Sequence, residues 1–193
     1  ATTFEENAAG VVIGSFSVID PSFSSSITYT ISGTGSENFE VVDDQLKLKD
    51  GITANYEVLN SYSITITATD DSGYTKSTTY PFEVIDVNDA PTGTSLSNMT
   101  IDENDVGGIV GDLTTTDEDS VDTHTYTLSG FYGNVFEVVN GQLKLKDGWY
   151  FNYETVSSFS ITVTSTDSGG LSTTSEYTIT VNDVNDKPTA VNL

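Results

Sequence analysis

A single segment recurs 97 residues apart and constrains the fold of the whole chain. The run Asp86–Thr92 (DVNDAPT) returns as Asp183–Thr189 (DVNDKPT), and an offset of 97 gives roughly 42 identities in 96 positions without an insertion. A period of this length is a complete domain, well above the 20–50 residues of solenoid repeats. The sequence therefore predicts two tandem domains, 1–89 and 90–186, with 187–193 starting the connection to a following repeat.

The charge of the chain is strongly acidic and limits its partners. There are 29 Asp and Glu residues against six Lys, no Arg and one His, which gives a formal net charge of -23. Such a chain repels nucleic acid phosphates and anionic lipid headgroups, so neither is expected as a partner. The sequence has no apolar run of 18 residues, so direct membrane insertion is not expected. Bound cations would relieve the self-repulsion of the carboxylates.

Apolar residues alternate with polar ones in short runs, which is the period of a β-strand. In Ser63–Ala68 every second side chain is apolar, so one face of this strand is buried and its threonines face water. None of the runs has helical spacing. Six runs in the first copy are strand candidates: Val11–Phe16, Ser26–Ile31, Phe39–Val42, Leu46–Leu48, Tyr62–Ala68 and Thr78–Ile85. Six or seven strands in about 90 residues predict an all-β fold with one Greek-key sandwich of two sheets per copy.

Carboxylates recur at matching places beside the turns of both copies. Ca²⁺ takes six to eight oxygen ligands from carboxylates, amides and carbonyls, and loops at one end of a domain can supply them together. Mg²⁺ suits such a loop set less well, because it requires octahedral geometry and keeps its waters. The alternative is that these acids only solvate the surface and end the strands. Their joint recurrence around an Asp-x-Asn-Asp segment favours calcium.

Four motifs stand in a fixed order along the chain. They are Glu6-Asn7 with Gly10, Asn55-Tyr56-Glu57, Ala68-Thr69-Asp70, and the linker Asp86–Pro91. Together they resemble two tandem cadherin-type repeats of the bacterial form, and the resemblance covers essentially the whole chain. It implies a seven-stranded sandwich per repeat. It also implies a Ca²⁺ cluster at each junction, with ligands from the base of one repeat, the linker and the top of the next.

The resemblance assigns ligands to the junction between the two repeats, where two or three Ca²⁺ ions are expected. These ligands are Glu6, Asn55, Glu57, Val87, Asn88, Asp89, Ala90, Asp117, Asp119 and Asp167. Val87 and Ala90 would contribute only carbonyl oxygens. Asn55 stands where the family usually has an aspartate, and the family's linker usually has one more residue before its proline.

The same resemblance implies a half-site toward each end of the chain. The C-terminal half-site would consist of Glu103, Asn152, Glu154, Val184, Asn185 and Asp186. The N-terminal half-site would consist of Asp20 and Asp70. Ser22 replaces the second aspartate of the family there, so this end is expected to bind calcium weakly or not at all.

An aromatic cluster occurs in the second copy only. Trp149, Tyr150 and Phe151 replace Ile52, Thr53 and Ala54 of the first copy, so the shared fold does not require them. Aromatic faces on a loop can stack on the sugar rings of a polysaccharide. The alternative is that they fill a locally different core or the interface between repeats, because aromatic residues dominate such places.

No pattern typical of an enzyme is found. Cysteine chemistry is excluded, the single His124 has no nucleophile-turn motif around it, and no Gly-rich phosphate loop is present. We therefore expect a non-enzymatic, calcium-rigidified tandem module of a bacterial cell-surface or secreted protein, which serves adhesion or acts as an extended spacer. Its partners would be calcium, neighbouring repeats and another cadherin-like module. The alternative is a carbohydrate-binding module for polysaccharide attachment.

Overall fold

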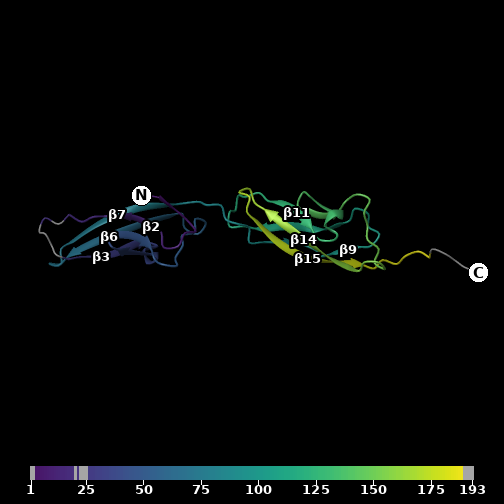
Figure 1. Cartoon of the computed structure of the whole chain (residues 1–193), viewed down its shortest axis with the longest axis horizontal. Helices are drawn as coiled ribbons and strands as arrows, with labels where there is room; N and C mark the ends of the chain where they lie inside the picture. The colour runs from purple at the N-terminus through teal and green to yellow at the C-terminus, as the bar shows by residue number, and fades with distance from the viewer. Residues whose placement is uncertain (1–2, 20, 22–25, 189–193) are drawn as a thin grey trace, which may run out of the picture. The chain divides into compact units, whose positions relative to one another are not determined.

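The computed structural model describes residues 3–19, 21 and 26–188 and divides the chain into two compact units, 1–87 and 88–193 (Figure 1). Its regular structure is all β, with two short 3-10 turns at Ser36–Asn38 and Gly133–Val135. The predicted all-β sandwich fold is confirmed. None of the helical segments among these residues is long and apolar enough to cross a membrane.

The first unit has two sheets, with strand orders β1-β7-β6-β3 and β2-β5-β4. β1 pairs with the end of β7 in parallel, and the other neighbours are antiparallel. The strands are β1 (Thr3–Glu5), β2 (Val12–Ser15), β3 (Ile27–Thr34), β4 (Phe39–Val42), β5 (Gln45–Leu48), β6 (Ser61–Asp70) and β7 (Thr75–Ile85).

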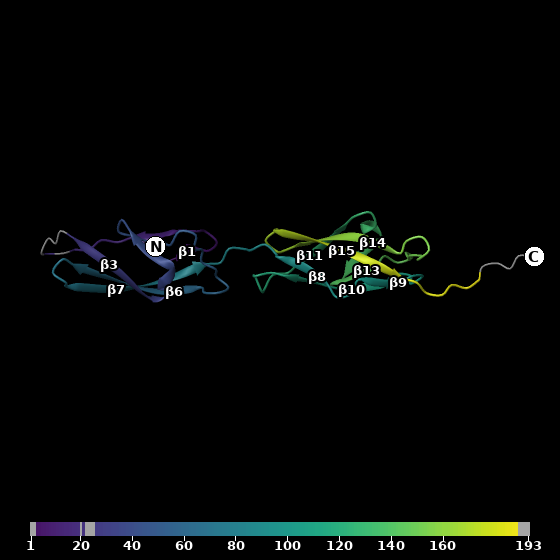
Figure 2. The ribbon, with the colours of Figure 1, turned by 90° about the horizontal axis from the view of Figure 1, so that it is seen from below.

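The second unit repeats this arrangement with one further strand, β8. Its sheets have the orders β12-β13-β10-β8 and β11-β14-β15-β9. Figure 2 shows β9 beside β15 and β8 beside β10. The strands are β8 (Gly93–Leu96), β9 (Thr100–Asp102), β10 (Ile109–Thr116), β11 (Thr125–Ser129), β12 (Phe136–Val139), β13 (Gln142–Leu145), β14 (Ser158–Thr166) and β15 (Ser172–Asn182).

Each unit has its own core between the two sheets, made by the inward positions of the alternating strands. Ile64 in β6 and its counterpart Ile161 in β14 are both fully buried. Aromatic rings fill both cores. Phe39 packs edge-on against Tyr62 with the ring centroids 5.1 Å apart, and Phe151 stacks on Phe159 with the ring centroids 4.5 Å apart. Burial of such side chains is the main stabilising term of each sandwich.

All six predicted strands of the first unit match the structure to within three residues at either end. β7 starts at Thr75 rather than Thr78, and β6 extends to Asp70. Val11–Phe16 forms only the four residues of β2. The sequence pattern does not predict β1, because three residues are too few to show an alternation of apolar and polar side chains. Pro81 has no amide hydrogen to donate. β1 covers β7 only at Glu83–Ile85, so among the described residues Pro81 pairs only with β6.

Candidate metal-binding sites

A buried glutamate holds together one end of the first unit. Glu6 is 3% exposed. Its Oε2 accepts a hydrogen bond from the Tyr56 amide at 2.6 Å and its Oε1 accepts one from the Val87 amide at 2.9 Å. Carboxylate oxygens of Glu57 lie within 4.8 Å of oxygens of Glu6 and of Asp86. A buried carboxylate thus fixes both the loop and the start of the linker, where the other acids gather.

The Asn55 side chain serves the same loop. Its Oδ1 accepts a hydrogen bond from the Val58 amide at 2.8 Å. In the second unit Asn152 Oδ1 accepts one from the Thr155 amide at 3.1 Å. Both predicted amide ligands therefore also shape the turn that presents the following glutamate.

The second unit repeats the buried glutamate. Glu103 is also 3% exposed and accepts hydrogen bonds from the amides of Tyr153 at 2.9 Å and Val184 at 2.8 Å. One carboxylate oxygen each of Glu103, Glu154 and Asp186 lies within 4.8 Å of the other two. Asn185 Nδ2 donates to the carbonyl of Asp186 at 3.2 Å, which orders the predicted linker ligands. The structure thus brings the acids of the predicted C-terminal half-site together.

A second acidic cluster lies at the other end of the second unit. Oxygens of Asp117, Asp122 and Asp167 are within 4.8 Å of one another, and Asp167 is 6% exposed. Asp122 Oδ1 accepts a hydrogen bond from Ser168 Oγ at 2.7 Å, whereas its Oδ2 is buried without a hydrogen-bond partner among the described residues. Sequence analysis missed Asp122, because the first copy has Ser25 at this position.

Two linker residues that belong to the second unit bind aspartates at this end of it. Asn88 Nδ2 donates to Asp167 Oδ2 at 3.1 Å, and the Asp89 amide donates to Asp119 Oδ2 at 2.7 Å. Gly169 makes room for the first contact, since a Cβ at that position would collide with the Asn88 side chain. Ala90, which follows, is exposed.

Asp167 is held in its charged form. Burial of the carboxyl would raise its pKa, but hydrogen bonds from the Asn88 side chain and from the backbone at Leu171 outweigh this effect, and the pKa is lowered below its usual value. His124 Nε2 lies 2.8 Å from Asp117 Oδ2. The other oxygen, Asp117 Oδ1, accepts a hydrogen bond from the Asp119 amide at 3.2 Å. Hydrogen bonds therefore orient the carboxylates of both Asp117 and Asp167.

The corresponding end of the first unit carries fewer acids. Asp70 Oδ1 accepts hydrogen bonds from the amides of Ser72 at 2.9 Å and Tyr74 at 2.8 Å, which repeats the turn at Asp167. The predicted ligand Asp20 lies outside the described residues. Pro21 and Ser22 stand where the second copy has Glu118 and Asp119. Within residues 3–19, 21 and 26–87, no group of three acids gathers around Asp70.

The donor atoms of these clusters suit calcium. They are carboxylate and amide oxygens, the ligands of a hard cation that accepts irregular geometry. The buried Oδ2 of Asp122 fits this interpretation, because a carboxylate oxygen without a hydrogen bond is costly unless a cation binds it. At Val87 and Val184 the expected ligand is the backbone carbonyl, which does not compete with the hydrogen bonds that their amides donate to Glu6 and Glu103.

The aromatic residues of the second unit divide into two groups. Phe151 is only 8% exposed and stacks within the core, which is the alternative given above for the aromatic cluster. The sequence could not separate it from its neighbours, because the loop places adjacent residues on opposite sides. Trp149 and Tyr150 are 52% and 54% exposed and line a surface hollow together with Tyr132 and Asn152.

Comparison with known proteins finds cadherin-like repeats. A cadherin-domain profile matches residues 1–85, and human protocadherin gamma-A10 is 32% identical over 152 residues, which are 75% of this chain and 16% of that protein. The chain is built of cadherin-like repeats. It spans only about a sixth of the length of protocadherin gamma-A10.

Solved structures share the fold of these cadherin-like repeats. Extracellular cadherin domains 3–6 of protocadherin gamma B2 match 95% of this chain with a TM-score of 0.69 at 19% identity, and the match covers 46% of that chain. Human protocadherin-24 EC1-2 matches 94% of this chain and 95% of its own, with a TM-score of 0.65 at 20% identity. Cadherin domains are extracellular, non-enzymatic adhesion modules that typically bind Ca²⁺ at their linkers.

Proposed function

We propose that this chain is a calcium-binding tandem module of a bacterial cell-surface or secreted protein, in which Ca²⁺ makes the connection between the repeats rigid. In this role it serves adhesion, or it spaces other domains away from the surface. The observation that carries the proposal is the pair of acidic clusters in the second unit, Asp117–Asp122–Asp167 and Glu103–Glu154–Asp186. Both consist of oxygen donors and both adjoin a linker segment.

The proposed junction site takes two or three Ca²⁺ ions. Its ligands from the first repeat are Glu6, Asn55 and Glu57, and Asp117, Asp119 and Asp167 come from the second. The linker adds Val87, Asn88, Asp89 and Ala90. Two hydrogen bonds support the assignment, because Asn88 and Asp89 each bind an aspartate of the proposed set. The C-terminal set around Glu103 would bind calcium together with a following repeat.

Rigidity is tested by removing the metal. Without Ca²⁺ the carboxylates repel one another and the linker flexes, whereas bound Ca²⁺ stabilises the folded state by mass action. We expect small-angle scattering to report a narrower range of conformations in 2–5 mM Ca²⁺, which is about the millimolar range of extracellular sites, and the melting temperature to rise. Identical scattering profiles and melting curves with calcium and with chelator would contradict the proposal.

A second candidate function is carbohydrate binding by the same module. It is supported by the half-exposed rings of Trp149 and Tyr150 beside the polar Asn152. A ring that stacks on a sugar contributes about 1 kcal/mol, so Trp149→Ala should weaken retention on insoluble chitin or cellulose about fivefold. Tyr74→Ala is the matched control, since Tyr74 is 78% exposed in the first repeat. Absence of retention by the unaltered chain would remove this candidate.

A further inference from the structure

The strand β3 forms an unpaired edge of the first repeat. Among the described residues it pairs only with β6, along the whole of Ile27–Thr34. Its counterpart β11 is likewise the last strand of its sheet in the second repeat, so the free edge is a property of the fold. Backbone amides and carbonyls along such an edge can pair with another strand.

β3 lacks the features that usually protect an exposed edge, which are charged side chains, proline and short length. No charged residue occurs from Pro21 to Ser36, although charged residues make up 18% of the chain. By contrast β4, the edge of the other sheet, has only four residues and includes Glu40, whose Oε1 lies 3.4 Å from Lys47 Nζ. β3 is therefore open to pairing where β4 is protected.

The inward side chains of β3 are only partly buried. Tyr29 and Ile31 pack against the core of the first repeat but remain partly exposed, whereas Ile66, which pairs with Ile31, is 6% exposed. A strand added beside β3 would cover this apolar surface. The Tyr29 ring is already held in place, because it packs edge-on against Phe16 and its hydroxyl donates to Asp44 Oδ1 at 2.8 Å.

The outward face beside this edge is uncharged. Outward positions of β3 continue across β6 and β7 as rows of hydroxyl side chains. The rows are Thr28–Thr69–Thr75, Thr30–Thr67–Ser77 and Ser32–Thr65–Thr79. Thr67 Oγ1 and Ser77 Oγ are 2.8 Å apart, so hydroxyls within a row bind each other. Such a face does not repel its equivalent in a second copy, which matters in a chain with a net charge of -23.

We propose that β3 pairs antiparallel with β3 of a second copy of this chain, so that the two sheets join into one. The same surface of both copies takes part, so the contact is isologous and forms a closed dimer. It supplies a contact for the proposed adhesive role and rests on that proposal only for its purpose. No carboxylate belongs to the paired segment, so the contact needs no calcium.

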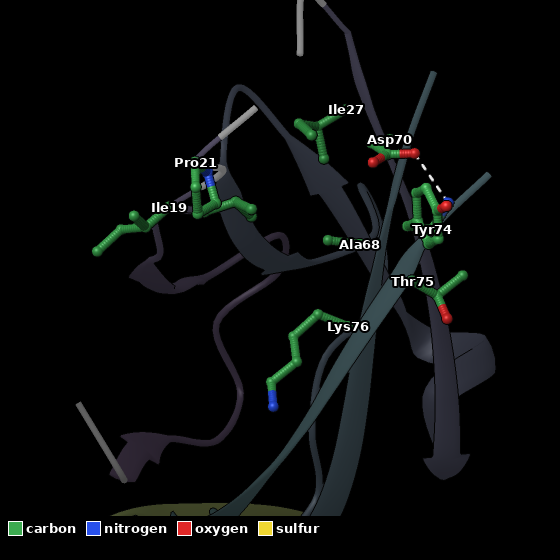
Figure 3. Close-up of a pocket in the computed structure, with 9 residues that line it drawn as sticks. Ile19, Pro21, Ile27, Ala68, Asp70, Tyr74, Thr75 and Lys76 are labelled. Atoms are coloured by element: carbon green, nitrogen blue, oxygen red, sulfur yellow. Dashed lines mark hydrogen bonds between the residues drawn. The ribbon is translucent and has the colours of Figure 1, made fainter. Parts of the chain in front are cut away.

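The register follows from the alternation of the strand. Residues directly opposite each other in an antiparallel pair lie on one face, so outward positions must meet outward ones. A two-fold axis at Thr30 meets this condition. The opposed residues are then Thr28 with Ser32, Tyr29 with Ile31, and Thr30 with Thr30. Ile27 comes opposite Gly33, which leaves room for it; Figure 3 shows Ile27 at the beginning of β3, beside its partner Asp70 of β6.

The counterpart β11 repeats the sequence of this edge without its uncharged, apolar surroundings. The run Thr-Tyr-Thr-Ile-Ser of β3 returns as Thr125–Ser129, with leucine in place of isoleucine. However, the polar His124 replaces Ile27 at the start of the strand, and Glu176 replaces Thr79 in the outward rows. The contact is therefore assigned to β3.

Charges introduced at Thr30 test the register. Thr30→Lys and Thr30→Glu each set like charges opposite one another at the two-fold axis, which should prevent pairing. A mixture of the two variants sets opposite charges there and should restore it. Thr127→Glu is the matched control, because Thr127 is the exposed counterpart of Thr30 on β11. Circular dichroism melts establish that each variant is folded.

Sedimentation equilibrium in chelator measures the association, with about 0.5 M NaCl to screen long-range repulsion. A contact of one strand pair is small, so the series runs from about 10 µM to 1 mM. We expect the average mass of the unaltered chain and of Thr127→Glu to rise from 20.6 kDa toward twice that value. Each Thr30 variant alone should stay at 20.6 kDa, and their equimolar mixture should rise like the unaltered chain. Hydrogen exchange of the β3 amides should be slower in the unaltered chain than in Thr30→Glu.

Several results would overturn the proposal. A chain that stays monomeric at every concentration, or Thr30 variants that associate like the unaltered chain, would exclude this contact. A mixture of the folded variants that remains monomeric would do the same, as would an equal loss of association in Thr127→Glu. Association that appears only with calcium would contradict this contact and leave the proposed calcium site standing. Association in chelator by a chain that binds no calcium would support the contact although the proposed calcium site had failed.

Discussion

The turn regions at the same end of the two repeats differ far more than the sandwiches that carry them. Asp167 in the second repeat lies with Asp117 and Asp122 in a cluster within 4.8 Å. Asp70, its counterpart, has the same backbone turn, but Ser22 and Ser25 stand where the second repeat has Asp119 and Asp122. The strand ladders and core positions are retained in both. The fold therefore specifies the turn, whereas a few loop residues determine whether other acids gather around its aspartate.

The two cores should respond alike to a cavity, and this gives the largest expected effect. Leu48 and Leu145 are counterparts with exposures of 0% and 1%. Leu48→Ala and Leu145→Ala should each destabilise their own repeat by about 2–5 kcal/mol, as measured by urea unfolding in chelator. Val58→Ala and Val121→Ala, at positions 82% and 90% exposed, are the controls. A large loss in only one repeat would show that the cores are not equivalent.

The equivalent aspartates should differ in their effect on calcium. Asp167→Asn removes a charged oxygen that the surrounding hydrogen bonds orient, so it should weaken Ca²⁺ affinity by about tenfold or more. Asp70→Asn should change the affinity by less than about twofold, because its end of the repeat lacks the other acids. Calcium titrations of both variants test this pair. Equal losses would mean that the end of the first repeat also binds calcium strongly.

Substitution of Asp122 should change the stability of the fold in opposite directions without and with calcium. Asp122→Asn replaces the unsatisfied Oδ2 by an amide that can donate to Asp117 or Asp167, so in chelator the variant should be about 1 kcal/mol more stable. In saturating calcium it should be less stable than the unaltered chain, because a ligand is lost. Differential scanning calorimetry in both conditions provides the measurement. Destabilisation in chelator would show that the acid has a structural role without metal.

Substitution of Gly169 should have the smallest effect on calcium affinity, and it contrasts most sharply with the same test at its counterpart in the first repeat. A methyl group there displaces the Asn88 side chain, which can rotate at little cost, so Gly169→Ala should weaken calcium binding about threefold to tenfold and change the melting temperature in chelator by only a few degrees. Ser72 is the counterpart in the first repeat. Ser72→Ala should leave calcium binding unchanged, and a loss there as large as in Gly169→Ala would argue against the Asn88 contact.

The sequence predicted the fold because its signals are local and repeated. Alternation in Ser63–Ala68 and the offset of 97 predict the strands and the tandem order without any knowledge of contacts. The buried carboxylates Glu6 and Glu103 were predicted from cadherin motifs, although only the structure gives their hydrogen bonds to the linker amides.

The missed or misassigned residues depend on contacts distant in sequence. Asp122 joins Asp167 across 45 positions of the chain, and no repeat of this acid occurs in the first copy to draw attention to it. Phe151 lies in the core while its neighbours Trp149 and Tyr150 are half exposed, a difference that depends on the path of an irregular loop.

Calcium titration by isothermal calorimetry tests the central claim most directly. The unaltered chain should bind two or three Ca²⁺ ions with a saturable heat, and Glu57→Ala and Asp89→Ala should each lower the affinity at least about tenfold. Glu83→Ala is the matched control, since Glu83 is an exposed acid whose counterpart is Thr180, and it should bind like the unaltered chain. A titration without saturable heat, or three variants with the same affinity as the unaltered chain, would contradict the proposed calcium site.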